Sequence, residues 1–130
     1  MTFLKYSILA IGGAIGTICR YALSTAMYAY FSMPVFPIGT LIVNLLGCFI
    51  IGILAGFSEK GFLEPVNARL FLFVGLLGGF TTFSAFSIET LNLIRQHQWR
   101  TAATYLTLSN VGGIALAFLG VQMALMLVRK

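Results

Sequence analysis

Long stretches without charge divide the chain into apolar segments. No charged side chain occurs in residues 21–58, 70–88 or 101–128. A helix needs about 20 mostly apolar residues to cross a bilayer, and a stretch of that kind can hold one. The first stretch is long enough for the end of one helix and the whole of another, and it contains Pro34 and Pro37, which interrupt helices. The pattern therefore predicts four membrane-spanning helices.

The expected spans cover one all-α integral membrane domain that fills residues 1–130. They are residues 4–30, 37–58, 70–94 and 101–128. A cleaved signal peptide is the alternative for the first span, but no small-residue cleavage site precedes a soluble domain and the hydrophobicity continues. Because one four-helix chain encloses little interior in lipid, a transporter or channel of this size is expected to form an oligomer.

Composition narrows the class of protein. Of the residues, 59% are hydrophobic and only 8% are charged, whereas a soluble domain is about a quarter charged. The net charge of +5 is scattered among apolar runs and forms no basic stripe for nucleic acid. The chain has no catalytic triad, no cluster of metal-ligating side chains and no phosphate loop, so an enzyme is not expected. Cys19 and Cys48 lie inside spans and are expected to pack, not to pair.

The few basic residues are divided between the two ends of the spans. The side that carries the N-terminus receives Lys5, Lys60, Arg69, Arg129 and Lys130. The other side receives Arg95 and Arg100, and also Arg20 if its side chain extends that way. The difference in basic residues between the two sides is small, so the positive-inside rule favours neither orientation of the chain strongly. The hypothesis that follows is insertion of the same chain in both orientations.

Polar side chains inside spans are costly and indicate function. Arg20 follows a long uncharged run, and it either anchors at the headgroups or attracts anions in a vestibule. Thr40 and Asn44 are four residues apart and share a helical face. The Asn44 amide either bonds across to another helix or offers its two donors to an anion.

The stretch from Gly75 to Glu89 is the most informative part of the chain. Gly78 and Gly79 precede two β-branched residues, Thr81 and Thr82, which is a poor helix centre. The pattern predicts a break, with an ordinary kink as the alternative. In a membrane, freed carbonyls at a break suit a small cation, and the next half-helix points its positive end at anions.

Aromatic and polar side chains follow the predicted break. Phe80, Phe83 and Phe86 recur every third residue and form one slanted stripe. Such a stripe usually packs, yet the electropositive edge of a phenyl ring can also contact an anion. Glu89 is either the carboxylate of a proton-coupled exporter or an end-of-span carboxylate that neighbouring hydroxyls or Asn44 satisfy. Tyr105 and Ser109 give the fourth span a hydroxyl-bearing face.

Three motifs together resemble the Fluc (CrcB) family of fluoride channels over the whole chain. They are GGAIGTICR at Gly12–Arg20, GTLIVNLLG at Gly39–Gly47 and GLLGGFTTFSAFSIE at Gly75–Glu89. The resemblance implies a passive fluoride channel that relieves fluoride toxicity by export from the cytoplasm. It implies an antiparallel, dual-topology homodimer with two pores in a cell membrane, expected to be the inner or plasma membrane of a bacterium.

The resemblance also implies a site for each motif. A structural Na⁺ at the dimer centre would be held by the backbone carbonyls of Gly78 and Thr81 from both subunits. Arg20 corresponds to the family's arginine near the vestibule. The remaining matches concern the anion pore, and they are Phe83, Phe86, Asn44, Thr40, Ser84, Ser87, Glu89, Tyr105 and Ser109.

The sequence departs from the family pattern at two places. Ala85 stands where the family often has threonine, and Gly112-Gly113 stands where Gly-Ser is common. These departures concern the polar track beside the rings and not the class of protein. A small multidrug exporter remains an alternative, although the first span has no acidic residue. A non-transporting assembly subunit and a cation channel are two further alternatives, and the second lacks an acidic ring.

Overall fold

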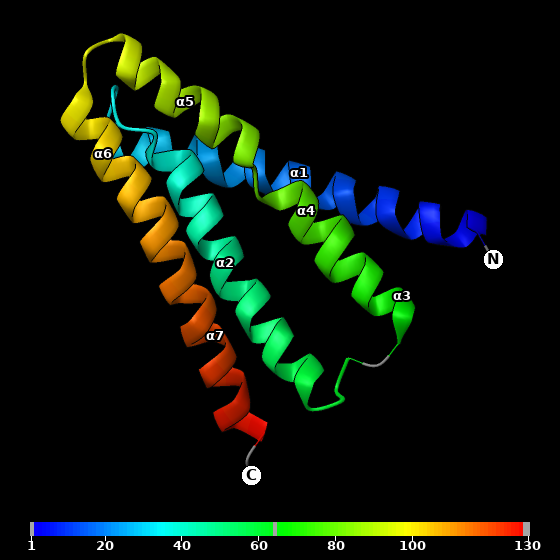
Figure 1. Ribbon diagram of the computed structural model, residues 1–130. Helices are drawn as coiled ribbons and strands as arrows, with labels where there is room; N and C mark the ends of the chain where they lie inside the picture. Colours follow the sequence, from blue (N-terminus) through cyan, green and yellow to red (C-terminus); the bar gives the residue numbers. More distant parts are fainter. Residues whose placement is uncertain (1, 64, 129–130) are drawn as a thin grey trace.

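The computed structural model describes residues 2–63 and 65–128, and those residues form helices joined by short connections (Figure 1). Four helical stretches, Thr2–Phe31, Ile38–Glu59, Val66–Arg95 and Trp99–Val128, are long and apolar enough to cross a membrane. The prediction of four spans is therefore confirmed. Glu64 lies outside the described residues, as do Arg129 and Lys130 of the charge pattern.

The first two spans are single α-helices, and the last two are each made of several segments. Segments with the wider π-helical winding are labelled η. The segments are α1 Thr2–Phe31, α2 Ile38–Glu59, α3 Val66–Arg69, η1 Leu70–Leu76, α4 Leu77–Phe80, α5 Phe83–Arg95, α6 Trp99–Thr107, η2 Leu108–Gly112 and α7 Gly113–Val128.

The third helix begins earlier than residue 70. It starts at Val66, directly after Pro65, which takes the N-cap position with extended backbone angles. Proline suits the start of a helix because the first turn does not need its missing N–H group. The polar residues Asn67 and Arg69 therefore belong to the first turn of the helix and not to the loop.

The predicted break in the third span is confirmed at Thr81 and Thr82. Both residues are extended, with φ/ψ of −86°/159° and −150°/117°. Gly78 still belongs to the short helix α4, so the β-branched pair and not the glycines leaves the helical conformation. Thr82 caps the next half-helix, because its hydroxyl accepts a hydrogen bond from the Ala85 N–H at 3.2 Å.

Figure 1 shows α2 and α7 running side by side in the same direction, while α1 crosses near the break in the third span. Glycines make both contacts close. A Cβ on Gly16 would lie 2.8 Å from the Phe80 nitrogen, and one on Gly56 would lie 2.7 Å from the Ala124 Cβ. Since no side chain fits there, these small residues set the distances between helices, as in other membrane proteins.

The buried interior is small and sits around the break. One cluster contains Leu41, Phe86, Leu93, Ala102 and Tyr105. Much of the remaining apolar surface is exposed, including Ile18 at 67%, Phe83 at 77% and Ile114 at 74%. Lipid can cover such side chains, so the fold places a polar centre inside a largely apolar exterior.

Candidate functional site

Asn44 ties the second span to the break in the third. Its side-chain oxygen accepts a hydrogen bond from the Thr82 N–H at 2.8 Å, and its Nδ2 donates to the Thr82 carbonyl at 3.0 Å. One side chain thus replaces the helical hydrogen bonds that Thr82 loses at the break. Of the two interpretations that the sequence leaves open for this amide, the structure shows the bond across to another helix.

The break releases the two carbonyls that the sequence singled out. In a continuous helix the Thr82 N–H would bond to the carbonyl of Gly78, but it donates to Asn44. Likewise the Ala85 N–H, the ordinary partner of the Thr81 carbonyl, donates to the Thr82 hydroxyl. Gly78 is also exposed. Both carbonyls therefore lose their helical partners, and carbonyl oxygens are suitable ligands for a hard cation such as Na⁺.

A cavity of about 330 Å³ lies beside the break, and we call it the aromatic pocket. None of the residues that line it is charged. It brings together six of the predicted site residues, although they come from three different spans. The six are Asn44, Gly78, Thr81, Phe83, Phe86 and Ser109, and Thr82 of the predicted break lines the pocket with them.

Aromatic rings continue from this pocket into the interior. The centroids of Phe83 and Phe86 are 5.5 Å apart, and those of Phe86 and Tyr105 are 5.3 Å apart. Tyr105 in turn meets Phe36 edge-on at 5.8 Å. Phe83 is exposed while Phe86 and Tyr105 are buried. The predicted stripe therefore does not stay on one surface, because Phe80 packs into a separate cluster with Val43 and Leu77.

Two hydroxyls hold the carboxylate of Glu89, and we call this group the hydroxyl clamp. Thr40 donates to Oε1 and Tyr105 donates to Oε2, each at 2.7 Å. Thr40 and Tyr105 are buried. Both carboxylate oxygens thus have a donor in a setting where an unpaired charge is very unfavourable. This agrees with the interpretation of Glu89 as a carboxylate that neighbouring hydroxyls satisfy, and the donors are Thr40 and Tyr105 rather than Asn44.

The serines expected beside the rings take two different positions. Ser84 and Ser87 are exposed on α5, on the same side as Phe83. The Ser87 hydroxyl donates to the Phe83 carbonyl at 2.9 Å. Ser109 instead has a buried hydroxyl with no hydrogen-bond partner among the described residues, and it lines the aromatic pocket. Within one chain, Ser84 and Ser87 are therefore separate from the hydroxyl clamp.

Arg20 lines a second cavity of about 320 Å³ that also reaches Thr40 and Thr82. The side chain is half-buried. A guanidinium at the edge of a cavity raises the local concentration of anions without placing a cation in the uncharged aromatic pocket. Ala85, one of the two departures from the family pattern, lines this second cavity and not the aromatic pocket.

Two contributors were not singled out as site residues from the sequence. Thr82 was expected only at the break, and it proves to be the partner of Asn44 and the cap of α5. A threonine directly before a helix is a common capping signal and could have marked it. Phe36 lies before the second span, and no local pattern indicates that its ring would meet Tyr105.

Residues 7–121 match the family described as "CrcB-like protein, Camphor Resistance (CrcB)". The chain belongs to the CrcB family. It is 46% identical to the fluoride-specific ion channel FluC of Methylobacillus flagellatus over 120 residues, which are 92% of this chain and 93% of the relative. It is 45% identical to the protein of the same name from Magnetococcus marinus over 111 residues, which are 85% and 89% of the two chains.

A third CrcB relative, the fluoride-specific ion channel FluC of Oceanobacillus iheyensis, is 44% identical over 118 residues, 91% of this chain and 89% of that one. The resemblance drawn from the three sequence motifs is thereby confirmed. The matching CrcB relatives are ion channels and not enzymes. Together with the four spanning helices, this membership makes the chain a multi-pass membrane protein.

Proposed function

We propose that this protein is a passive, fluoride-selective channel that releases F⁻ from the cytoplasm and so relieves fluoride toxicity. The relatives named above support the choice of ion. The observation that carries the proposal is the aromatic pocket, which is uncharged and leads along three rings to the hydroxyl clamp. Conduction needs binding that is favourable but weak, and dipoles and ring edges provide it.

Selectivity follows from how strongly an anion accepts hydrogen bonds. Fluoride is small and strongly hydrated, so a pathway must replace its water by several donors. The Ser109 hydroxyl has no partner among the described residues. The Thr40 and Tyr105 hydroxyls can rotate from Glu89 toward a passing anion. Fluoride competes with a carboxylate for such donors, whereas chloride is a weaker acceptor and is larger.

The electrochemical gradients make a passive pathway sufficient. Fluoride enters cells as the neutral acid HF and dissociates in a more alkaline cytoplasm. The inside-negative membrane potential then drives F⁻ outward, at about 2.3 kcal/mol per charge for each 100 mV. The membrane is the inner or plasma membrane of a bacterium in this proposal, in line with the organisms of the relatives.

The proposal predicts fast fluoride efflux and slow chloride efflux from liposomes that contain the purified protein. Fluoride- and chloride-selective electrodes would follow the two ions after a potassium ionophore is added to balance the charge. Because the pathway offers weak donors and no fixed cation, we expect chloride efflux at least about a hundredfold slower. Liposomes without protein are the control. Chloride efflux as fast as fluoride efflux would contradict the assignment.

We further propose an antiparallel dual-topology homodimer with two pores and a structural Na⁺ at its centre. Support comes from the released carbonyls of Gly78 and Thr81, because both residues line the aromatic pocket together with the exposed Phe83. Two carbonyls are few for a buried cation, and a second copy would double them. Na⁺ would then neutralise the carbonyl dipoles that face one another across the interface.

A dimer held in this way should depend on Na⁺. Exchange of Na⁺ for N-methylglucammonium, which is too large to sit between carbonyls, is expected to lower the fluoride flux and to weaken the dimer. Light scattering of the detergent-solubilised protein measures the mass, and the electrode assay measures the flux. Replacement of Na⁺ by N-methylglucammonium with no change in either quantity would contradict the cation site.

A further inference from the structure

A polar cavity of about 220 Å³ lies further along α5 than the aromatic pocket, and we call it the outer pocket. Tyr28 and Phe36 contribute to its wall from the end of α1 and the connection to α2. Glu89, Asn92 and Gln96 contribute from α5. These three residues recur at spacings of three and four, so they form one stripe along the helix. The stripe begins at the hydroxyl clamp.

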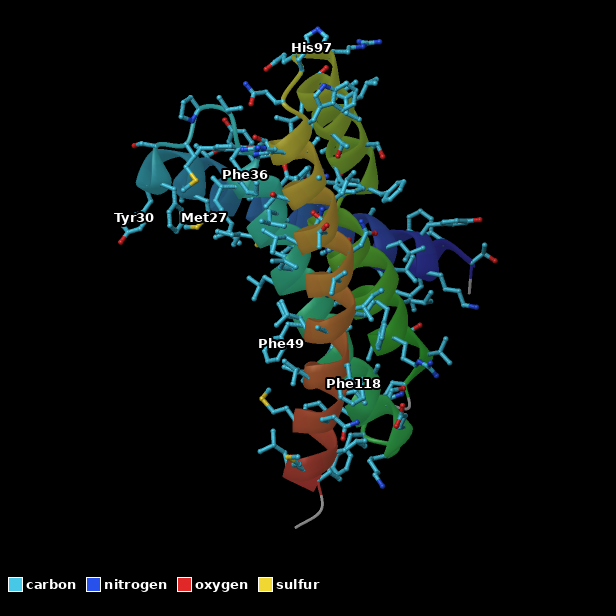
Figure 2. The ribbon with its side chains drawn as sticks, turned by 60° about the vertical axis from the view of Figure 1, so that its left-hand side comes forward. Met27, Tyr30, Phe36, Phe49, His97 and Phe118 are labelled. Atoms are coloured by element: carbon cyan, nitrogen blue, oxygen red, sulfur yellow. The ribbon has the colours of Figure 1, made fainter. Side chains whose placement is uncertain are left out.

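The other end of this stripe reaches the end of the span. Helix α5 ends at Arg95, and Gln96 is its C-cap. From Glu89 to Gln96 the helix rises about 10 Å, which is two turns. Gln96, His97, Gln98 and Trp99 are all exposed. Figure 2 shows His97 at the tip of this turn, and an exposed tryptophan is typical of the membrane–water interface. The outer pocket thus joins the half-buried carboxylate of Glu89 to the surface.

The row of aromatic rings connects the outer pocket with the aromatic pocket. Phe83 and Phe86 line the aromatic pocket, and Phe36 lines the outer pocket. Tyr105 lies between them, with ring centroids 5.3 Å from Phe86 and 5.8 Å from Phe36. In Figure 2, Phe36 is at the turn between the end of α1 and α2. The two cavities are therefore successive along one row of rings.

We propose that the outer pocket is a binding site for a small, strongly hydrated anion and forms the outer mouth of the pathway. This inference rests on the proposed channel function. The amides of Asn92 and Gln96 each offer N–H donors at the level where an anion leaving the clamp regains water. Tyr28 adds a hydroxyl and Phe36 adds a ring. Both amides are exposed, so water can reach the same place.

Charge changes at Gln96 test this mouth, because charge at a mouth changes the local anion concentration. At about 0.01 M ionic strength, where charges act over about 30 Å, Gln96→Lys is expected to raise fluoride flux about threefold and Gln96→Glu to lower it similarly. At about 1 M potassium isethionate, where the range falls to about 3 Å, the two variants should converge. The electrode assay in liposomes measures all four fluxes.

Gln98→Lys and Gln98→Glu are the matched controls. Gln98 is exposed in the same turn, does not line the outer pocket and makes no side-chain cap hydrogen bond. We expect its pair to differ much less than the Gln96 pair. If wild-type protein passes fluoride and the Gln96 pair behaves like the Gln98 pair, the outer mouth is contradicted while the channel stands. Wild-type protein that passes no fluoride contradicts the channel itself.

Discussion

Replacement of Asn44 by leucine is expected to reduce fluoride flux by more than about a hundredfold, the largest effect expected in this protein. Leucine has similar volume but cannot bond to the N–H and carbonyl of Thr82. Each unpaired backbone group inside a span costs about 1–3 kcal/mol. The break would then lose its fixed geometry, and with it the cap of α5 and the released carbonyls of Gly78 and Thr81.

A second substitution at Asn44 separates packing from hydrogen bonding. Aspartate keeps the oxygen that accepts from Thr82 N–H, but it turns the donor toward the Thr82 carbonyl into another oxygen. It also adds a negative charge to the uncharged aromatic pocket. Asn44→Asp should therefore also conduct poorly, and a variant that keeps the elution volume of the wild type would show that the loss of flux is not a loss of folding. Fluoride electrodes and size-exclusion chromatography measure the two properties.

Asn67 provides a control of the same residue type. It is exposed in the first turn of the third span, away from the break. Asn67→Leu and Asn67→Asp should leave flux and elution volume close to those of the wild type. Near-normal flux in both Asn44 variants would show that the bond to Thr82 is not needed for conduction.

Tyr105→Phe is expected to lower fluoride flux by about ten- to a hundredfold, while the protein stays folded. The variant keeps the ring that packs against Phe86 and Phe36 and removes the hydroxyl that donates to Glu89. A hydrogen bond to a charged group contributes about 1.5–3 kcal/mol, which corresponds to that range of rates. Fluoride flux from liposomes with the same protein density measures this loss.

Tyr30→Phe removes a hydroxyl from a tyrosine that is 80% exposed and points away from the bundle at the end of α1 (Figure 2). Its flux should equal that of the wild type. Thr40→Val removes the other donor to Glu89 and should act in the same direction. Since both hydroxyls serve one carboxylate, the double variant should lose less than the product of the two single losses. Independent effects would mean that the clamp does not act as a unit.

Local sequence determined the spans and the place of the break. Uncharged stretches of sufficient length must be helical in lipid, where each backbone group needs an internal partner. In such a helix the run Gly78-Gly79 followed by Thr81-Thr82 is conspicuous, because glycine and threonine have low helix propensity. Helix ends were less certain, and Val66 begins its helix earlier than expected because Pro65 forms the cap.

The identity of hydrogen-bond partners was beyond the reach of sequence. Thr40, Glu89 and Tyr105 belong to the second, third and fourth spans, and only the packed bundle brings their oxygens to 2.7 Å. The positions of the three serines were likewise decided by packing. Ser84 and Ser87 lie on the exposed side of α5, while the hydroxyl of Ser109 is buried beside the aromatic pocket. Which face of a helix is buried depends on its neighbours.

The sequence by itself thus determined a low-charge, four-span membrane chain with a broken third helix and a stripe of phenylalanines. Only the tertiary structure decided that Asn44 bonds to the backbone of Thr82 at the break and that two hydroxyls donate to Glu89. It also decided that Phe36 extends the row of rings toward the surface. The reason is the range of the forces involved. Helix formation in lipid depends on neighbouring residues, whereas a partner for a buried polar group is found wherever packing brings one within hydrogen-bond distance.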